Sequence, residues 1–134
     1  MAGYSGTPLP RKLGIKEGSR VALLGAPEGF DSTLGELPAG VEPRTQARGS
    51  FDVVVLFTTR RAELERRLDV LTRAIHPAGG LWVAWPKRAS KVPTDLDENA
   101  VRDVALPKGL VDNKVAAIDD TWSGLRLVIR KENR

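Results

Sequence analysis

The chain has no cysteine and only one histidine, His76. Without cysteine it has no disulfide framework, no thiolate zinc site, no iron–sulfur cluster and no cysteine nucleophile. A single imidazole also excludes a histidine-rich metal site, so we expect no metal. His76 precedes Pro77 at the end of a helical pattern. A histidine in this position more often adds a favourable charge to the helix C-terminus than catalyses a reaction.

Long hydrophobic runs are also missing. The longest apolar run has five or six residues, whereas a helix that spans a bilayer needs about 20. The N-terminal sequence MAGYSGTPLPRK lacks the apolar centre of a signal peptide. We therefore expect a cytoplasmic protein that does not associate with membranes. Its 134 residues suit one domain, because domains cluster at about 100–150 residues. We expect residues 1–19 to be a lead-in segment on the surface of that domain.

Charge of one sign is not concentrated in any part of the chain. Lysine and arginine number 21 and acidic residues 17, which gives a net charge of +4 and a pI near 9.8. No run of five like charges occurs, and the acidic residues between 95 and 103 interrupt the basic series. A mixed, solvated surface explains this pattern better than a dedicated polyanion site, so we do not expect nucleic acid as a partner.

Three short apolar runs predict strands at residues 20–25, 52–58 and 80–85. Each run is apolar at consecutive positions, which is typical of parallel strands covered by helices on both faces. Between the last two runs, a stripe at spacings of three and four consists of Leu64, Leu68, Leu71 and Ile75. This stripe predicts an amphipathic helix over 60–75 with Thr59 as its N-cap. Strand, helix and strand together predict a right-handed βαβ crossover.

The C-terminal part of the chain predicts one more helix and a hairpin. Cap-forming and acidic residues at 94–97 predict a helix that ends near Leu106, just before a proline. Two further strands are expected at 114–119 and 125–131, joined by a turn over residues 120–124.

These elements together predict an α/β fold, a three-layer Rossmann-like sandwich whose sheet is mostly parallel. The strand at 125–131 should lie between the strands at 80–85 and 114–119 and run antiparallel to both. Trp82 and Trp85 are three positions apart on one strand, so they should face opposite sides of the sheet and anchor one helical layer each.

The pattern resembles the second half of class I S-adenosylmethionine-dependent methyltransferases, over about 80 residues from Phe51 onward. The residues that carry this resemblance are Asp52-Val-Val-Val-Leu, the amphipathic helix, His76-Pro-Ala-Gly-Gly-Leu-Trp-Val and the closing hairpin. Nearly the whole chain is also similar to a small bacterial family of unknown function. The motifs shared with that family are Tyr4-Ser-Gly-Thr-Pro-Leu, Leu13-Gly-Ile-Lys, Leu81-Trp-Val-Ala-Trp-Pro-Lys, Gly109-Leu-Val-Asp-Asn-Lys and Thr121-Trp-Ser-Gly-Leu-Arg.

The chain departs from the methyltransferase pattern where those enzymes hold their cofactor. The resemblance implies a glycine-rich turn after the first strand, but Pro27 in this turn has no N–H and a fixed φ. Residues 26–50 have room for a short helix after Asp31 and one edge strand at 40–46, whereas the enzymes place two further strands there. Glu42 is poorly placed to bind a ribose. We therefore expect no cofactor and favour a non-catalytic regulatory or protein-interaction module, although enzymatic activity stays open.

An alternative function is the binding of a small anionic or nucleotide-like ligand, with or without catalysis. The carboxyl ends of parallel strands meet at one edge of the sheet, where open α/β folds bind ligands. The hydroxyl, cationic and glycine residues there suit a phosphate or carboxylate. These candidate ligand-binding residues are Gly25, Gly29, Thr58, Thr59, Arg60, Lys87 and Arg88. The cations are equally compatible with an ordinary solvated surface.

Trp122 is a candidate contact for a partner, because a large aromatic residue is uncommon in a tight turn. It could instead fold back onto the edge of the sheet. The sequence identifies neither the ligand nor the protein partner, and it leaves the oligomeric state unknown.

Overall fold

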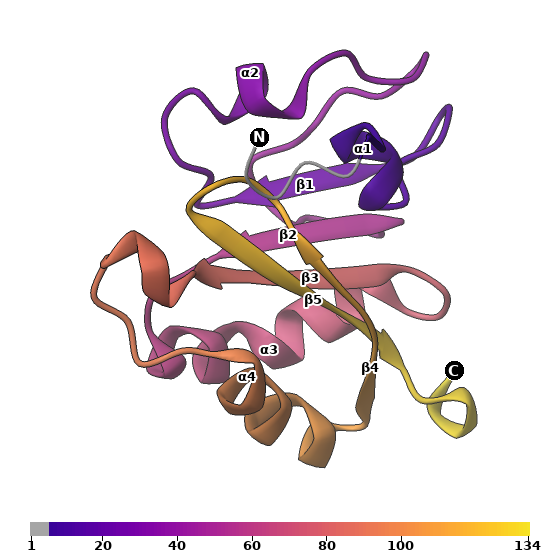
Figure 1. The fold of residues 1–134 in the computed structure, drawn as a ribbon. Helices are drawn as coiled ribbons and strands as arrows, with labels where there is room; N and C mark the ends of the chain where they lie inside the picture. The colour runs from indigo at the N-terminus through magenta and orange to yellow at the C-terminus, as the bar shows by residue number, and fades with distance from the viewer. Residues whose placement is uncertain (1–5) are drawn as a thin grey trace.

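In a computed structural model that describes residues 6–134, five strands form one sheet in the order β1-β2-β3-β5-β4 (Figure 1). The strands are β1 (Val21–Leu24), β2 (Val53–Phe57), β3 (Gly80–Pro86), β4 (Leu110–Ala117) and β5 (Trp122–Ile129). The first three strands are parallel, and β5 is antiparallel to both β3 and β4. This confirms the mostly parallel sheet and the predicted position of the last strand.

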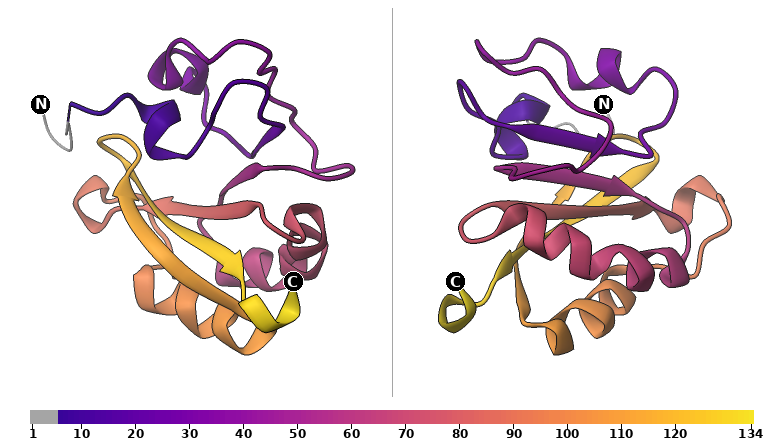
Figure 2. Two further views of the ribbon diagram at one scale, coloured as in Figure 1. Left: turned by 90° about the vertical axis from the view of Figure 1, so that its right-hand side faces the viewer. Right: turned by 180° about the vertical axis from the view of Figure 1, so that it is seen from behind.

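Helices cover both faces of the sheet, as Figure 2 shows. They are α1 (Leu9–Lys12), α2 (Phe30–Leu34), α3 (Arg61–Ile75) and α4 (Glu98–Ala105), with short 3-10 helices at Arg88–Ser90, Leu106–Lys108 and Lys131–Asn133. Helices α3 and α4 pack against one face and enclose one hydrophobic core. The segment with α1 and α2 covers the other face and encloses a second core. The three-layer α/β fold is therefore confirmed. No helix within residues 6–134 combines the length and hydropathy needed to cross a membrane.

Helix α3 buries the predicted stripe, since Leu64, Leu68, Leu71 and Ile75 are all buried. Its predicted N-cap is wrong, because the N-cap residue is Arg60 and makes no side-chain cap hydrogen bond. Asp95, which lies before α4, instead accepts a hydrogen bond from the backbone N–H of Arg61 at 2.7 Å. A carboxylate far along the chain thus satisfies a free N–H at the helix N-terminus.

Trp82 and Trp85 face opposite sides of β3, as predicted, because Trp85 belongs to the core under α3 and Trp82 to the second core. Trp82 also donates a hydrogen bond from Nε1 to the carbonyl of Leu13 at 3.1 Å. Leu13 and Ile15 are buried beside it. Most of residues 6–19 are exposed, as expected of a surface lead-in, but Leu13 and Ile15 complete the second core. Residues 1–5 lie outside the described residues.

Residues 26–50 contain the predicted short helix, α2, but the predicted strand at 40–46 is wrong. Only Arg44 pairs with β1, through its N–H to Val21 O and its carbonyl to Leu23 N, both at 2.8 Å. The chain bends at Thr45 and Gln46 and leaves the sheet after this one residue. Strand β1 is therefore an outer strand of the sheet.

The hairpin turn is shorter than predicted, because β5 already begins at Trp122 and includes Gly124. Asp119 closes the turn by accepting hydrogen bonds from the N–H groups of Thr121 (2.8 Å) and Trp122 (2.7 Å). A Cβ added to Gly124 would lie 3.0 Å from the ring of Trp82. Gly124 therefore lets Trp82 pack closely against β5. The prediction that Gly124 belongs to the turn is wrong.

Candidate functional site

Thr58, Thr59 and Arg60 follow β2 at the carboxyl edge of the sheet, and hydrogen bonds hold the two threonines. Thr58 is buried, and its hydroxyl accepts a hydrogen bond from the N–H of Arg60 at 3.2 Å. The carbonyl of Thr59 accepts a hydrogen bond from the hydroxyl of Thr94 at 2.7 Å. These groups fix the loop before α3, while the side chain of Arg60 is exposed to solvent.

Lys87 follows β3 and is bound to the hairpin turn. Its Nζ donates to the carbonyl of Asp119 at 2.6 Å, and its N–H donates to the carbonyl of Thr121 at 2.7 Å. Arg88 is exposed in the next turn of the chain. None of the cavities described below is lined by Thr58, Arg60, Lys87 or Arg88. A shared ligand for these residues stays a prediction.

The two candidate glycines lie in the loop after β1, and both have a positive φ, of 70° for Gly25 and 79° for Gly29. A Cβ added to Gly25 would lie only 2.9 Å from the carbonyl oxygen of Phe57. Gly25 is therefore required by the close approach of the end of β2. Gly29 is the N-cap residue of α2 and lines a mostly apolar cavity of about 380 Å³ beside Phe30 and Arg44.

Aromatic side chains gather where β2 ends and β5 begins. The ring of Phe57, the last residue of β2, lies 4.8 Å from the ring of Phe30 and 5.2 Å from that of Trp122, edge to face in both pairs. Trp122 is half-buried and packs against the second core. The interpretation that Trp122 folds back onto the sheet is confirmed, and its contact with a partner stays a prediction.

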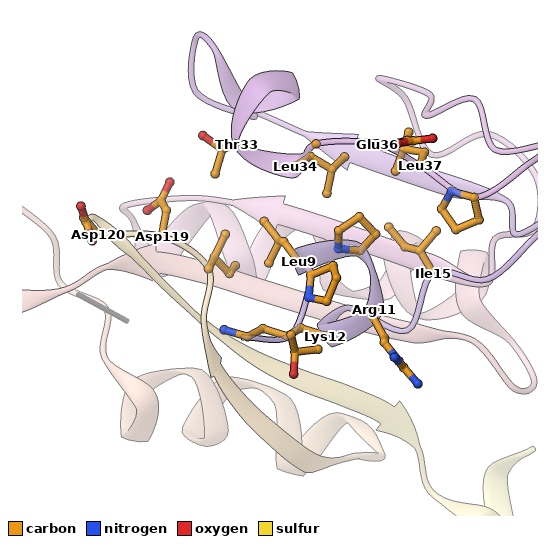
Figure 3. Close-up of a pocket in the computed structure, with 16 residues that line it drawn as sticks. Leu9, Arg11, Lys12, Ile15, Thr33, Leu34, Glu36, Leu37, Asp119 and Asp120 are labelled. Atoms are coloured by element: carbon orange, nitrogen blue, oxygen red, sulfur yellow. The ribbon is translucent and has the colours of Figure 1, made fainter. Parts of the chain in front are cut away.

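An open groove of about 840 Å³ lies between α1, the segment that follows α2, and the β4–β5 turn. Figure 3 shows the aliphatic side chains that face one another across it. Its apolar lining consists of Pro8, Leu9, Pro10, Ile15, Leu34, Leu37, Pro38 and Ile118. Asp119 and Asp120 lie at one end of this apolar groove, and Arg11 and Glu36 lie toward the other. The sequence analysis did not identify it, because its sides come from three distant segments.

A further cavity of about 470 Å³ lies at the amino edge of the parallel strands, opposite the carboxyl edge. It lies beside Asp52 and Ala78, which precede β2 and β3. We call it the basic cavity, because five of its lining residues are cationic: Arg11, Lys12, Lys16, Lys114 and Arg126. The sequence analysis missed it as well, since these residues are scattered between positions 11 and 126. Within residues 6–134, no cluster of three or more histidine and acidic side chains could hold a metal ion.

Comparison with solved structures shows that the chain has the fold of S-adenosylmethionine-dependent methyltransferases. One such enzyme, from Aquifex aeolicus, aligns with a TM-score of 0.61 and 16% identity, over 90% of this chain and 87% of the enzyme. Ribosomal protein L11 methylase from Lactobacillus delbrueckii subsp. bulgaricus gives 0.61 and 11%, over 92% and 75%. Fibrillarin from Aeropyrum pernix, solved with S-adenosyl-L-methionine, gives 0.57 and 15%, over 94% and 70%.

These identities establish a common fold and nothing more specific. No family model matches the sequence, and no curated protein matches it either. The resemblance to class I methyltransferases is thus confirmed as a Rossmann-like architecture, in which the sheet of this chain ends at β1 with the single bridge to Arg44.

Proposed function

We propose that this chain is a non-catalytic regulatory or protein-interaction module on a shortened methyltransferase-like fold. The aromatic cluster at the carboxyl edge carries this proposal. Open α/β folds bind ligands at that edge, but here Phe30, Phe57 and Trp122 pack ring against ring over the end of β2. Apolar rings in contact leave few polar groups there to orient a charged cofactor.

The loop after β1 supports the same proposal. The resemblance implies a turn whose glycines allow the cofactor to approach the backbone. In this chain Gly25 is needed for its contact with Phe57, and Pro27 supplies no N–H. Helix α2 has only five residues, so few peptide dipoles align behind its N-terminus. Each of these features weakens a site for S-adenosylmethionine.

The apolar groove is the surface that we assign to the partner. Its volume and apolar lining suit an extended peptide segment that inserts aliphatic side chains between Leu9 and Leu37. Asp120 is exposed at one end, so a basic residue in the peptide would complement it. The partner is therefore expected to present a short apolar segment with a positive charge at one end.

Absence of cofactor binding is tested by calorimetric titration and thermal unfolding with S-adenosylmethionine, S-adenosylhomocysteine and nucleotides. A ligand at about 100 times its dissociation constant would add about 2.7 kcal/mol to the free energy of unfolding, so a specific site would be visible. We expect no saturable binding of S-adenosylmethionine. Saturable binding of S-adenosylmethionine or a nucleotide by the folded chain would contradict the proposal and support the small-ligand alternative.

Partner binding is tested with Leu37→Asp, which places a charge in the groove, and Val115→Asp as a matched control on exposed β4. Once a partner is identified by cross-linking in cells, we expect Leu37→Asp to weaken its binding by about tenfold or more. The control should bind like the unmodified chain. Equal binding by both variants, with thermal unfolding unchanged, would exclude the groove as the contact surface.

A further inference from the structure

The basic cavity carries a positive charge that the rest of the structure does not neutralise. It has five cationic residues and one acidic residue, Asp52. The Oδ2 atom of Asp52 already accepts a hydrogen bond from the N–H of Arg20 at 2.8 Å. Among the basic residues that the structure describes, only Arg66, Arg102 and Lys108 form ion pairs. None of the five cations in the cavity has a carboxylate within ion-pair distance.

Arg126 is the most constrained of these cations. It lies on β5 opposite Trp82 of β3, and burial lowers the pKa of its guanidinium. A Cβ added to Gly80 would lie 2.5 Å from the Nε atom of Arg126. The guanidinium therefore rests on the backbone of β3, in a space that only glycine leaves free. A partly buried charge without a counterion is costly, and an anion in the cavity would offset that cost.

We propose that the basic cavity binds the polyphosphate group of a small ligand. A di- or triphosphate carries about three to four negative charges near neutral pH, which matches the excess of cations over carboxylates. The planar guanidinium of Arg126 suits two phosphate oxygens at once, while lysine ammonium groups such as that of Lys114 bind as point charges. The volume of about 470 Å³ is within the usual range of small-molecule sites, about 300–1,000 Å³.

The arrangement favours a small ligand over a nucleic acid strand. The cations come from α1 and the loop after it, from β4 and from β5, and all of them line one concave site. Arg11 and Lys12 line the apolar groove as well, and Nζ of Lys12 donates to the carbonyl of Ala117 at 3.5 Å. A nucleic acid strand needs basic residues along an extended groove, together with aromatic rings for its bases. The lining of the basic cavity contains no aromatic residue. This site lies at the opposite edge from the predicted cofactor region, so the inference does not depend on the proposed function.

The test is a calorimetric titration of the full chain with inorganic tripolyphosphate at about 0.15 M salt, which screens long-range attraction. We expect saturable binding of one equivalent and a dissociation constant that rises about tenfold in Arg126→Gln. Lys114→Gln should weaken binding in the same direction. Arg66→Gln is the matched control, since it removes the same charge from an exposed residue of α3 that does not line the basic cavity and should change binding by less than about twofold.

Thermal unfolding without ligand separates a folding defect from a binding defect. We expect Arg126→Gln to unfold at the same temperature as the unmodified chain or a higher one, because it removes a desolvated charge. No saturable binding by the unmodified chain, or equal weakening in Arg126→Gln and Arg66→Gln, would overturn the proposal. A single-stranded oligonucleotide could displace tripolyphosphate at a concentration below that of tripolyphosphate itself. If this displacement is lost in Arg126→Gln, the cavity binds nucleic acid and the polyphosphate proposal is wrong.

Discussion

Gly25 and Gly14 both have a positive φ, of 70° and 82°, but only Gly25 is crowded. A Cβ at Gly25 would lie 2.9 Å from Phe57 O, whereas one at Gly14 would meet nothing within 4 Å. We expect Gly14→Ala to cost about 1 kcal/mol, the usual penalty of this conformation for an L-residue. Gly25→Ala should cost about 1–3 kcal/mol more, because a backbone oxygen must move. Urea denaturation of both variants measures the difference.

Equal losses in the two alanine variants would mean that the loop after β1 moves away from β2 at little cost. In that case the close approach of Phe57 would not explain why residue 25 is glycine, and Gly25 could serve a ligand instead. The result therefore bears directly on the proposed function, because it separates the conformational role of this glycine from a role in cofactor binding.

The sequence predicts which side of the sheet each tryptophan of β3 faces, but it does not predict which residues pack around the tryptophans. The alternation of side chains along a strand fixes the opposite faces of Trp82 and Trp85. Trp122 was misplaced in a turn because Gly124 looked like a turn residue, whereas its role is to leave room for Trp82. A contact between two strands that are distant in the sequence has no local signature, so a glycine that permits it cannot be distinguished from one that forms a turn.

Helix α4 is joined to β4 by Arg102, whose Nε donates to Oδ2 of Asp112 at 2.9 Å, and Arg102 also pairs with Glu98. The hydrogen bond from the guanidinium lowers the pKa of Asp112 from its ordinary value. Because the pKa is lower in the folded state than in the unfolded state, this pair stabilises the fold at pH values above about 4. That contribution is lost as the pH falls through the pKa of the folded state.

We expect Arg102→Gln to be less stable than the unmodified chain at pH 7 and to differ less from it near pH 3. Urea midpoints at the two pH values measure this difference, and an NMR titration of the Asp112 carboxyl group follows its pKa directly. In the variant that pKa should rise toward about 3.9. A loss of stability that is the same at both pH values would show that Arg102 acts through packing alone.

The elements with strong periodicity were predictable, while the segment between β1 and β2 was less so. The stripe of α3 and the apolar runs of β2 and β3 follow from burial on both faces of a parallel sheet. The single bridge at Arg44 depends on bends at Thr45 and Gln46, and such bends have weak local signals. The N-terminus of α3 was mispredicted because its carboxylate, Asp95, comes from another loop.

The candidate surfaces of the molecule were the least predictable feature. Charges of both signs are mixed along the sequence, which predicts a mixed surface and describes most of the residues well. Arg11, Lys114 and Arg126 form one cavity only because α1 packs over the face of the sheet that contains Trp82. The net charge of +4 therefore understates how strongly positive the surface is at this place.

The sheet has buried central strands, and its two outer strands are β1 and β4. This arrangement predicts which backbone amides exchange their hydrogens slowly and which exchange them fast. Strands β2 and β3 are paired on both sides and fully buried, so their amides should exchange only on global unfolding. Strand β4 has one neighbour, a register shift between Asp112 and Lys114, and exposed residues 113–115. We expect amides 113–115 to exchange much faster than Val54 and Val55, as measured by NMR.

An exposed outer strand is also a place where a second chain can add to the sheet. If β4 proved as protected as β2 at high protein concentration and lost that protection on dilution, its free edge would be paired in a dimer. Protection that does not depend on concentration would instead contradict the predicted order within one molecule. The same exchange experiment therefore tests both the stability gradient across the sheet and the oligomeric state.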